Sequence, residues 1–359
     1  MKKYFIFLVS ALLVSIEAYS QVNRPQEPKP PFDYTIKEVT FKNETEGISL
    51  AGTLTYPAKG SKFPAVILIS GSGPQDRNSE IMNHKPFLVI ADHLTKNGIA
   101  VLRVDDRGTA ESGGNYNESG LNDFVADTKS ALEFLKGHKK INRKQIGLIG
   151  HSLGGNIAPI VATERESDVA FIVLLAGSGI RGDELMLLQK ATIERKMGVP
   201  EAAVMQAQNN MKGAYDIILN SAAEPDEIQI ELKKYFTDKF GGMIPEKQVE
   251  AIAKQMTMPW FSDFVKFDPE EILEKVKCPV LALNGANDLQ VPSKENLAAI
   301  NKALEAGANK DYQTQELEGL NHLFQESETG LPNEYASIEQ TFSPLALDII
   351  TEWINERTQ

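Results

Sequence analysis

Residues 146–154, Ile146-Gly147-Leu148-Ile149-Gly150-His151-Ser152-Leu153-Gly154, contain a short apolar run followed by one Gly-x-Ser-x-Gly sequence. The apolar run favours a buried strand and residues 156–164 favour a helix, so Ser152 is expected on the turn between them. This setting is typical of a nucleophile elbow, in which a strained turn exposes the serine hydroxyl. Glycines are needed on both sides because backbone passes close to backbone in so sharp a turn.

On either side of this segment, apolar runs that favour strands alternate with runs that favour helices. A hairpin is expected from residues 36–42 and 48–56. Further strands are expected at 65–69, 99–104, 146–149, 169–175, 279–283 and 312–317, and helices at 87–97, 121–136, 293–304 and 344–357. Such alternation predicts an α/β fold with a mostly parallel central sheet and helices on both faces.

The alternation is interrupted between residues 181 and 266, where helix-like segments occur without an apolar strand run. An insert of this length between two sheet strands predicts a helical cap or lid, set into a core formed by residues 34–180 and 267–359. The insert is rich in methionine, which suits an adaptable apolar pocket. Packing of the cap onto the core explains most of these methionines equally well.

The N-terminal residues 1–20 resemble a secretory signal peptide. Lys2 and Lys3 precede an apolar run, and Ala18 and Ser20 are small residues where a signal peptidase would read them. A membrane anchor is the alternative, but the run is shorter than the roughly 20 residues of a spanning helix. We therefore expect export to the periplasm or the medium, no stable membrane span in the mature form, and a flexible lead-in at residues 21–33.

Composition limits the partners and the chemistry. The formal net charge of the 359 residues is −12, which argues against binding to nucleic acid and fits a small neutral or cationic substrate. Solubility alone would explain this charge equally well. The single cysteine, Cys278, permits no internal disulfide, and without a Cys/His cluster the sequence predicts no metal site. Nor does it call for an organic cofactor. The oligomeric state cannot be read from it.

A serine hydroxyl needs a base to accept its proton, and the base needs an acid to orient it. Chance places a Gly-x-Ser-x-Gly pentapeptide in roughly one chain of this length in ten, so Ser152 needs such partners to be convincing. After Ser152 the remaining histidine is His322, and Asp288 lies between them; each follows an expected strand. The order Ser, Asp, His is the order of a triad on this architecture. Taken singly, Asp288 would serve as a helix cap or turn residue, and His322 as a structural histidine.

Two backbone N–H groups are expected to stabilise an oxyanion. One belongs to Leu153, and the other to Ser72 in the glycine-rich loop after the strand 65–69, with Gly71 as the neighbouring alternative. A plain Gly/Pro turn is the other interpretation of this loop. His151 is interpreted as packing around the site. Arg107, in the run Asp105-Asp106-Arg107-Gly108, is interpreted as tying loops together near it.

These segments carry a resemblance. The chain is similar to secreted bacterial carboxylesterases of the α/β-hydrolase superfamily, which carry a Gly-Ser-Gly-Pro-x-Asp-Arg segment after the third strand. That segment is matched at residues 71–77, the elbow at 150–155, and the acid and base segments at 288–292 and 321–325. Pro259-Trp260-Phe261 matches the exit from the lid. Covering about residues 34 to 357, the resemblance implies that Ser152, His322 and Asp288 act on short acyl esters.

Three hypotheses follow. The first is a serine carboxylesterase that cleaves a small ester through an acyl-enzyme on Ser152. The alternative is an aminopeptidase or prolyl-type peptidase, which would hold a free amino terminus with carboxylates of the insert; that set is Glu184, Glu224, Asp226 and Glu227. Those carboxylates are equally well explained as a solvated helix face. A non-catalytic binding module on the same fold is the third.

Overall fold

The computed structural model describes residues 23–358, so the predicted signal peptide lies outside the described residues. The chain forms two compact units. Residues 23–116, 121–180 and 268–358 make up the sheet unit, and residues 117–120 and 181–267 make up the helical unit. Residues 181–267 carry helices and no strand, and the role of this segment as a cap stays a prediction.

An eight-stranded sheet forms the centre of the sheet unit, in the order β1-β2-β4-β3-β5-β6-β7-β8. Its strands are β1 (Tyr34–Asn43), β2 (Ile48–Pro57), β3 (Phe63–Ile69), β4 (Ala100–Val104), β5 (Ile141–His151), β6 (Phe171–Leu175), β7 (Val280–Gly285) and β8 (Tyr312–Leu317). The hairpin β1–β2 joins β4 in antiparallel pairing, and all pairs from β4 to β8 are parallel. The predicted, mostly parallel sheet is confirmed.

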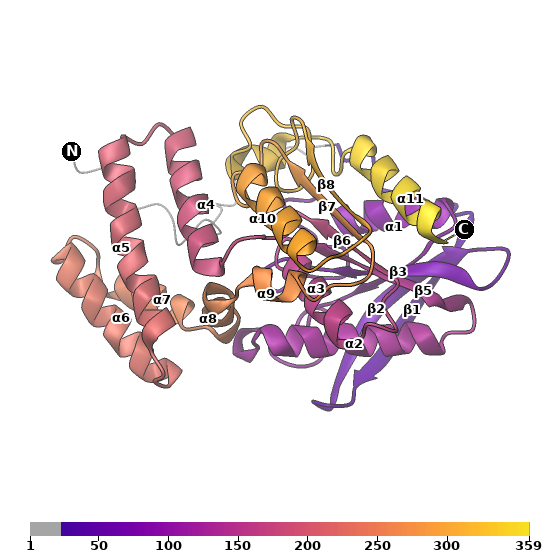
Figure 1. The fold of residues 1–359 in the computed structure, drawn as a ribbon, viewed down its shortest axis with the longest axis horizontal. Coiled ribbons are helices and arrows are strands. Elements are labelled where there is room, and N and C mark those ends of the chain that lie inside the picture. Colours follow the sequence, from indigo (N-terminus) through magenta and orange to yellow (C-terminus); the bar gives the residue numbers. More distant parts are fainter. Residues whose placement is uncertain (1–22, 359) are drawn as a thin grey trace. The chain divides into compact units, whose positions relative to one another are not determined.

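Helices cover both faces of this sheet (Figure 1). On one face, α1 (Pro86–Lys96) and α11 (Pro344–Thr358) pack on alternate strand residues such as Val66, Leu68 and Val173. On the other, α2 (Leu121–Gly137) and α3 (Gly154–Glu164) pack on β3, β5 and β6, and α10 (Ser293–Ala306) on β7 and β8. Because successive strand side chains point to opposite faces, strands buried on both faces consist of continuous apolar residues. The short helix α9 (Pro269–Leu273) packs against α3 and α10.

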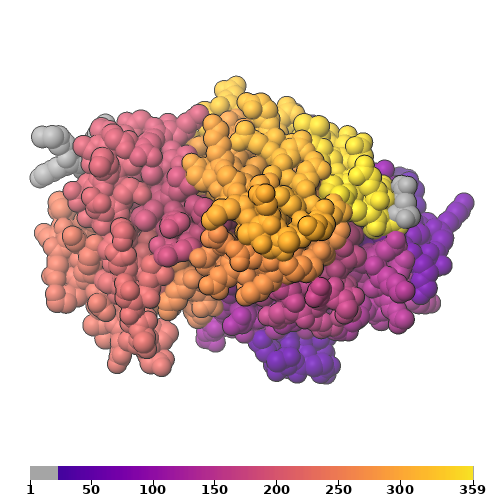
Figure 2. Space-filling model, viewed as in Figure 1, coloured from indigo at the N-terminus to yellow at the C-terminus, as the bar shows by residue number. Residues whose placement is uncertain are grey.

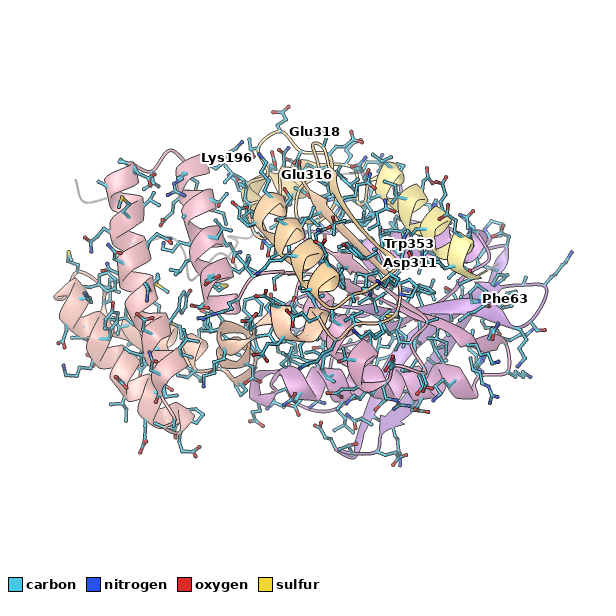
Figure 3. The ribbon with its side chains drawn as sticks, in the orientation of Figure 1. Phe63, Lys196, Asp311, Glu316, Glu318 and Trp353 are labelled. Carbon is cyan, nitrogen blue, oxygen red and sulfur yellow. The ribbon has the colours of Figure 1, made fainter. Side chains whose placement is uncertain are left out.

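The last helix, α11, is held to the sheet by aromatic and ionic contacts at its C-terminal end. Trp353 meets Phe171 edge to face with ring centroids 5.8 Å apart. Arg357 lies over the Trp353 ring at 3.9 Å and pairs with Asp311 at 2.6 Å; Trp353 and Asp311 are labelled in Figure 3. The opposite side of α11 forms part of the surface seen in yellow in Figure 2.

The helical unit consists of five helices: α4 (Gly182–Lys196), α5 (Glu201–Asn220), α6 (Pro225–Phe240), α7 (Glu246–Met256) and α8 (Pro259–Lys266). Its core includes Tyr215, Phe236 and Met256, and Met186, Met211 and Met258 pack against it. Met197, Met205 and Met243 are exposed. Packing thus accounts for part of the methionine content. No helix among residues 23–358 is long and apolar enough to cross a bilayer.

The segment before β1 differs from the flexible lead-in that the sequence suggests. The Arg24 guanidinium donates hydrogen bonds to the carbonyls of Met82 and Ala336, at 3.0 and 2.9 Å. Gln26 donates to the Phe342 carbonyl and accepts from the Thr341 N–H. Polar side chains in a proline-rich segment can thus tether it to loops distant in sequence, which composition alone does not reveal.

Candidate active site

Ser152 lies on the turn between β5 and α3, with φ of +53° in the left-handed region. Its N–H donates to the Leu175 carbonyl at 2.9 Å, which ties the turn to the end of β6. A Cβ at Gly150 would collide with the Gly154 carbonyl, and one at Gly154 with the Ile69 carbonyl. Close approach of the backbone therefore requires glycine at positions 150 and 154. Ser152 is the residue of the turn that adopts the strained left-handed backbone conformation.

The structure brings Asp288 and His322 together across 34 residues of sequence. The His322 Nδ1 lies 2.8 Å from Asp288 Oδ2, and the two residues are 5% and 3% exposed. Because a carboxylate can only accept, Nδ1 carries the proton and donates it. This tautomer leaves Nε2 as the ring nitrogen that can accept a proton.

The second carboxylate oxygen of Asp288 closes its own turn. Oδ1 accepts the N–H groups of Gln290 and Val291, at 2.8 and 2.9 Å. Asp288 does not cap the following helix, because the residue before α10 is Pro292. Asp288 therefore has two roles: Oδ1 closes its own turn, and Oδ2 orients His322.

The turn that carries His322 is closed by its own side chains. Asn321 Oδ1 accepts the N–H groups of Leu323 and Gln325, at 2.9 and 3.0 Å. Asn321 Nδ2 donates to Gln325 Oε1, and the side-chain Nε2 of Gln325 donates to the Gln340 carbonyl. Phe324 has φ of +59° and is fully buried. The residues around His322 therefore fix the backbone from which the imidazole projects.

His151 packs directly against His322. Their ring centroids are 4.8 Å apart, and His151 Nε2 lies 2.8 Å from the His322 carbonyl, to which it must donate. Burial, with a smaller contribution from the neighbouring His322, lowers the pKa of His151 to about 4. His151 is therefore neutral near pH 7 and holds the His322 backbone without adding charge beside its ring.

The predicted oxyanion amides lie in segments that adjoin Ser152. A Cβ at Gly71 would lie 3.2 Å from Ser152 Cβ, so the loop after β3 passes directly over the elbow. The N–H groups of Ser72 and Leu153 have no acceptor among residues 23–358, and neither has the Ser152 hydroxyl a hydrogen bond there. Catalytic hydrogen bonds are often long before substrate binds, so this geometry is compatible with a base at His322.

Known proteins with similar sequences and structures include several esterases. A model of the family described as serine aminopeptidase, S33, matches residues 84–221. Esterase EstD of Thermotoga maritima is 25% identical over 323 residues, which cover 90% of this chain and 69% of that protein. The Pyrococcus furiosus esterase Pf2001 superposes with a TM-score of 0.54 at 16% identity, covering 96% of this chain and 100% of the esterase. Est1E of Butyrivibrio proteoclasticus gives 0.51 at 15%, covering 89% and 98%.

The chain has the α/β-hydrolase fold and is similar to esterases.

In this α/β hydrolase the loop after β3 is anchored by two adjacent carboxylates that follow β4. Asp105 accepts from the Arg77 N–H at 2.7 Å and from two guanidinium nitrogens of Arg77, at 3.0 and 2.6 Å. Burial opposes ionisation of Asp105, but these Arg77 bonds keep its pKa below the ordinary value. Asp106 accepts from the Ser70 hydroxyl and from the Gln75 N–H. Tyr116, on the turn before α2, accepts the Gly73 N–H at 2.7 Å.

Arg107 makes different contacts from its two acidic neighbours. Its guanidinium donates to Asp127 of α2 at 2.7 Å, to Glu46 of the β1–β2 turn at 2.6 Å, and to the Asp123 carbonyl at 2.8 Å. It thus ties α2 to the hairpin. The sequence interpretation missed the two acidic residues of the run 105–108. Asp106 bonds to Ser70 and Gln75 in the loop beside Ser152, and Asp105 bonds to Arg77 just after it. Their position directly after a strand was the available indication of such a role, because functional sites in these sheets gather at the C-terminal ends of the strands.

No cluster of three or more metal-ligating side chains occurs in the described part of this hydrolase.

Proposed function

We propose that this α/β hydrolase cleaves carboxylic esters of short acyl chains through an acyl-enzyme on Ser152. The observation that carries the proposal is the 2.8 Å bond between His322 and Asp288, in a histidine that also packs on the residue preceding Ser152. It is supported by the similarity to Esterase EstD, whose name states its activity.

In the proposed mechanism, His322 Nε2 accepts the Ser152 proton as the serine oxygen attacks the ester carbonyl carbon. The carbonyl oxygen becomes an oxyanion that the N–H groups of Leu153 and Ser72 stabilise. Collapse of this intermediate expels the alcohol, which takes the proton from His322. A water molecule then attacks the acyl carbonyl carbon as His322 takes its proton. The second tetrahedral intermediate collapses by breaking its bond to the Ser152 oxygen, which takes the proton from His322 as the acid leaves. Asp288 stabilises the imidazolium in both steps.

The decisive variant is Ser152→Ala. It removes the nucleophile, and we expect the rate on p-nitrophenyl butyrate to fall by about 10⁴-fold or more with an unchanged thermal unfolding curve. Ser130→Ala is the control, because that hydroxyl bonds to the Ala126 carbonyl on α2. Undiminished turnover by the Ser152 variant would refute the proposal. Labelling of the native protein by a fluorophosphonate separates it from a non-catalytic binding module, which would not be labelled.

A serine peptidase is the second candidate, because the matching family is described as serine aminopeptidase. Such an enzyme must hold a free amino terminus, for which the carboxylates Glu184, Glu224, Asp226 and Glu227 of the helical unit are candidates. Parallel rates on a p-nitrophenyl ester series and on amino-acid p-nitroanilides discriminate the two. Faster cleavage of the anilides would replace the ester proposal.

We also propose that residues 1–20 direct export and are removed before Gln21. N-terminal sequencing of protein from the periplasm or medium tests this. A mature chain that starts at Met1 would contradict it.

A further inference from the structure

We propose that Asp106 is a positioning residue that holds the oxyanion loop, residues 70–75, over Ser152. This inference rests on the proposed function, because it assigns the support of the Ser72 amide. Asp106 bonds to both ends of the loop. One carboxylate oxygen accepts the Ser70 hydroxyl, and the other accepts the Gln75 N–H at 2.9 Å. The Asp106 N–H returns a bond to the Gln75 carbonyl at 3.0 Å.

Between these two anchors lie Gly71, Ser72, Gly73 and Pro74, of which Gly73 has φ of +92°. Two glycines in four residues give the free loop a wide choice of conformations. An oxyanion donor is effective only when its N–H is held at the position where charge develops. Fixing both ends of so short a loop restricts its middle, so the Asp106 carboxylate contributes to catalysis without touching substrate.

The other anchors each hold one point. Tyr116 accepts the Gly73 N–H, and Asp105 binds Arg77, which lies beyond the end of the loop. The Gln75 side chain donates to the Ser72 carbonyl at 3.3 Å, which stiffens the loop from within. Among the described residues, Asp106 is the side chain that bonds to both ends.

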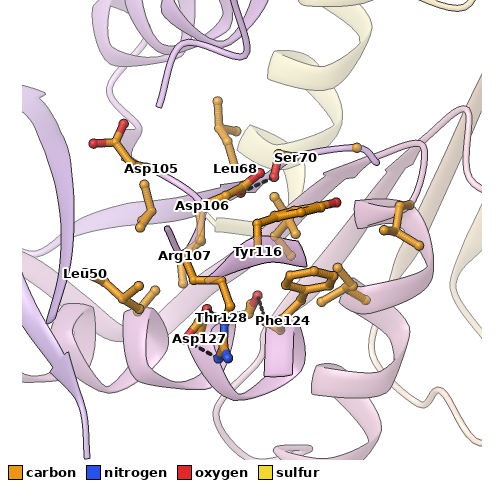
Figure 4. A pocket seen from close by; sticks show the side chains of 17 residues that line it. Leu50, Leu68, Ser70, Asp105, Asp106, Arg107, Tyr116, Phe124, Asp127 and Thr128 are labelled. Carbon is orange, nitrogen blue, oxygen red and sulfur yellow. Dashed lines mark hydrogen bonds and ion pairs between the residues drawn. The ribbon is translucent and has the colours of Figure 1, made fainter. Parts of the chain in front are cut away.

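A cavity of about 50 Å³ is lined in part by Ser70 and Gly71 of the loop. Its walls include Gly71, Leu153, Asp106 and Tyr116, so it reaches from the loop to the residue after Ser152. Figure 4 shows the Asp106 carboxyl directed toward Ser70, with Tyr116 beside it. Without the carboxylate, the loop has space into which to relax, and we expect the Ser72 amide to lose its position.

The test compares Asp106→Ala with Asp106→Asn and Ser70→Ala. The alanine variant removes the side-chain bonds at both ends of the loop and keeps only the bond from the Asp106 N–H to the Gln75 carbonyl. We expect kcat to fall about 10- to 100-fold with KM within about 3-fold, because the oxyanion forms only after substrate has bound. Affinity for an alkylboronic acid, which forms a tetrahedral adduct at Ser152, should fall in step with kcat/KM. Asparagine can accept from the Gln75 N–H and donate to the Ser70 hydroxyl, so it should restore kcat to within about 5-fold. Ser70→Ala frees one end and should lower kcat about 3-fold.

Asp127→Asn is the matched control. Asp127 lies in the wall of the same cavity and bonds to Arg107 and Asn43 instead of the loop. Its kcat should stay within about 2-fold. An Asp106→Ala enzyme with native kcat, a rise in KM alone, or an asparagine variant as impaired as alanine would overturn the inference. If the alanine variant does not fold, an unchanged kcat in Ser70→Ala overturns it. A native enzyme that neither hydrolyses esters nor reacts with a fluorophosphonate instead refutes the proposed function.

Discussion

The turns that carry Asp288 and His322 and the loop that carries Ser72 are held in different ways. In the two turns, side chains bond to backbone groups no more than four residues away, as Asp288 does with Val291 and Asn321 with Gln325. The oxyanion loop is held by Asp106, which lies 31 residues after Gln75. Local bonds close the acid and base turns, and bonds from His151 and to Gln340 only add to them. The oxyanion loop instead depends on a residue after a neighbouring strand and on a partly buried charge. The following variants test that contrast.

The largest effect is expected from Asp288→Asn. The asparagine can still accept the N–H groups of Gln290 and Val291, so the turn should persist. Its neutral amide cannot stabilise the imidazolium, and kcat should fall by about 10³- to 10⁴-fold. Steady-state kinetics on a p-nitrophenyl ester measure this, with urea unfolding as the control for the turn. A loss below about tenfold would remove Asp288 from the mechanism.

A smaller effect is expected from Asn321→Ala, which tests whether the turn that carries His322 is held by its own side chains. The variant leaves the buried N–H groups of Leu323 and Gln325 unpaired, which should lower the free energy of unfolding by about 2–3 kcal/mol. Loss of the fixed backbone should reduce kcat about 10-fold. The matched control is Asn309→Ala, because Asn309 bonds to the Asp311 N–H and to the carbonyls of Val276 and Cys278 in another loop. Equal loss of kcat in both variants would mean that His322 responds to general destabilisation.

The smallest effect concerns the pH dependence of stability at the oxyanion loop. Burial, with smaller contributions from the Asp127 and Asp105 carboxylates, raises the pKa of Asp106 to about 7 against the hydrogen bonds from Ser70 and Gln75. Arg107 and Tyr116 complete the ionisable groups that line the same cavity. Between its unfolded pKa near 4 and the folded pKa near 7, Asp106 binds more protons in the folded protein, so its contribution to stability declines as pH rises.

Asp106→Asn removes this ionisation. The free energy of unfolding of the variant relative to the native protein should therefore increase from pH 5 to pH 8, by about 1–2 kcal/mol because solvent reaches part of the side chain. Urea unfolding at the two pH values measures the difference. A difference that stays constant or decreases with pH would contradict the assignment.

Local patterns were enough to predict most of the sheet unit, but not every boundary. Apolar residues indicated a strand at 146–149, whereas β5 begins at Ile141. Residues 142–145 of this strand are polar, and the pairing of Phe63 with Ile141 across an irregularity in the ladder extends it. A polar run can be a strand when a neighbour supplies its hydrogen bonds, and that neighbour is not visible in the local sequence.

In the candidate site, too, local patterns predicted some residues and missed others. The strand–turn–helix pattern, together with the order of Ser152, Asp288 and His322, predicted which residues to examine, and the structure places His322 against Asp288. The role of Asp106 was missed, because Arg107 is the residue in that run that most often ties loops together. An acidic residue after a strand does not reveal which loop it will meet.

From the sequence alone came the alternation of strands and helices, the elbow with its glycines, and the short turns around Asp288 and His322. These features depend on residues close together in the chain, whose conformational preferences act locally. Tertiary structure alone decided that β4 lies beside β3 and not beside β5. That choice places the carboxylates after β4 against the loop after β3, because strand order is set by long-range backbone pairing and by the packing of helices on both faces.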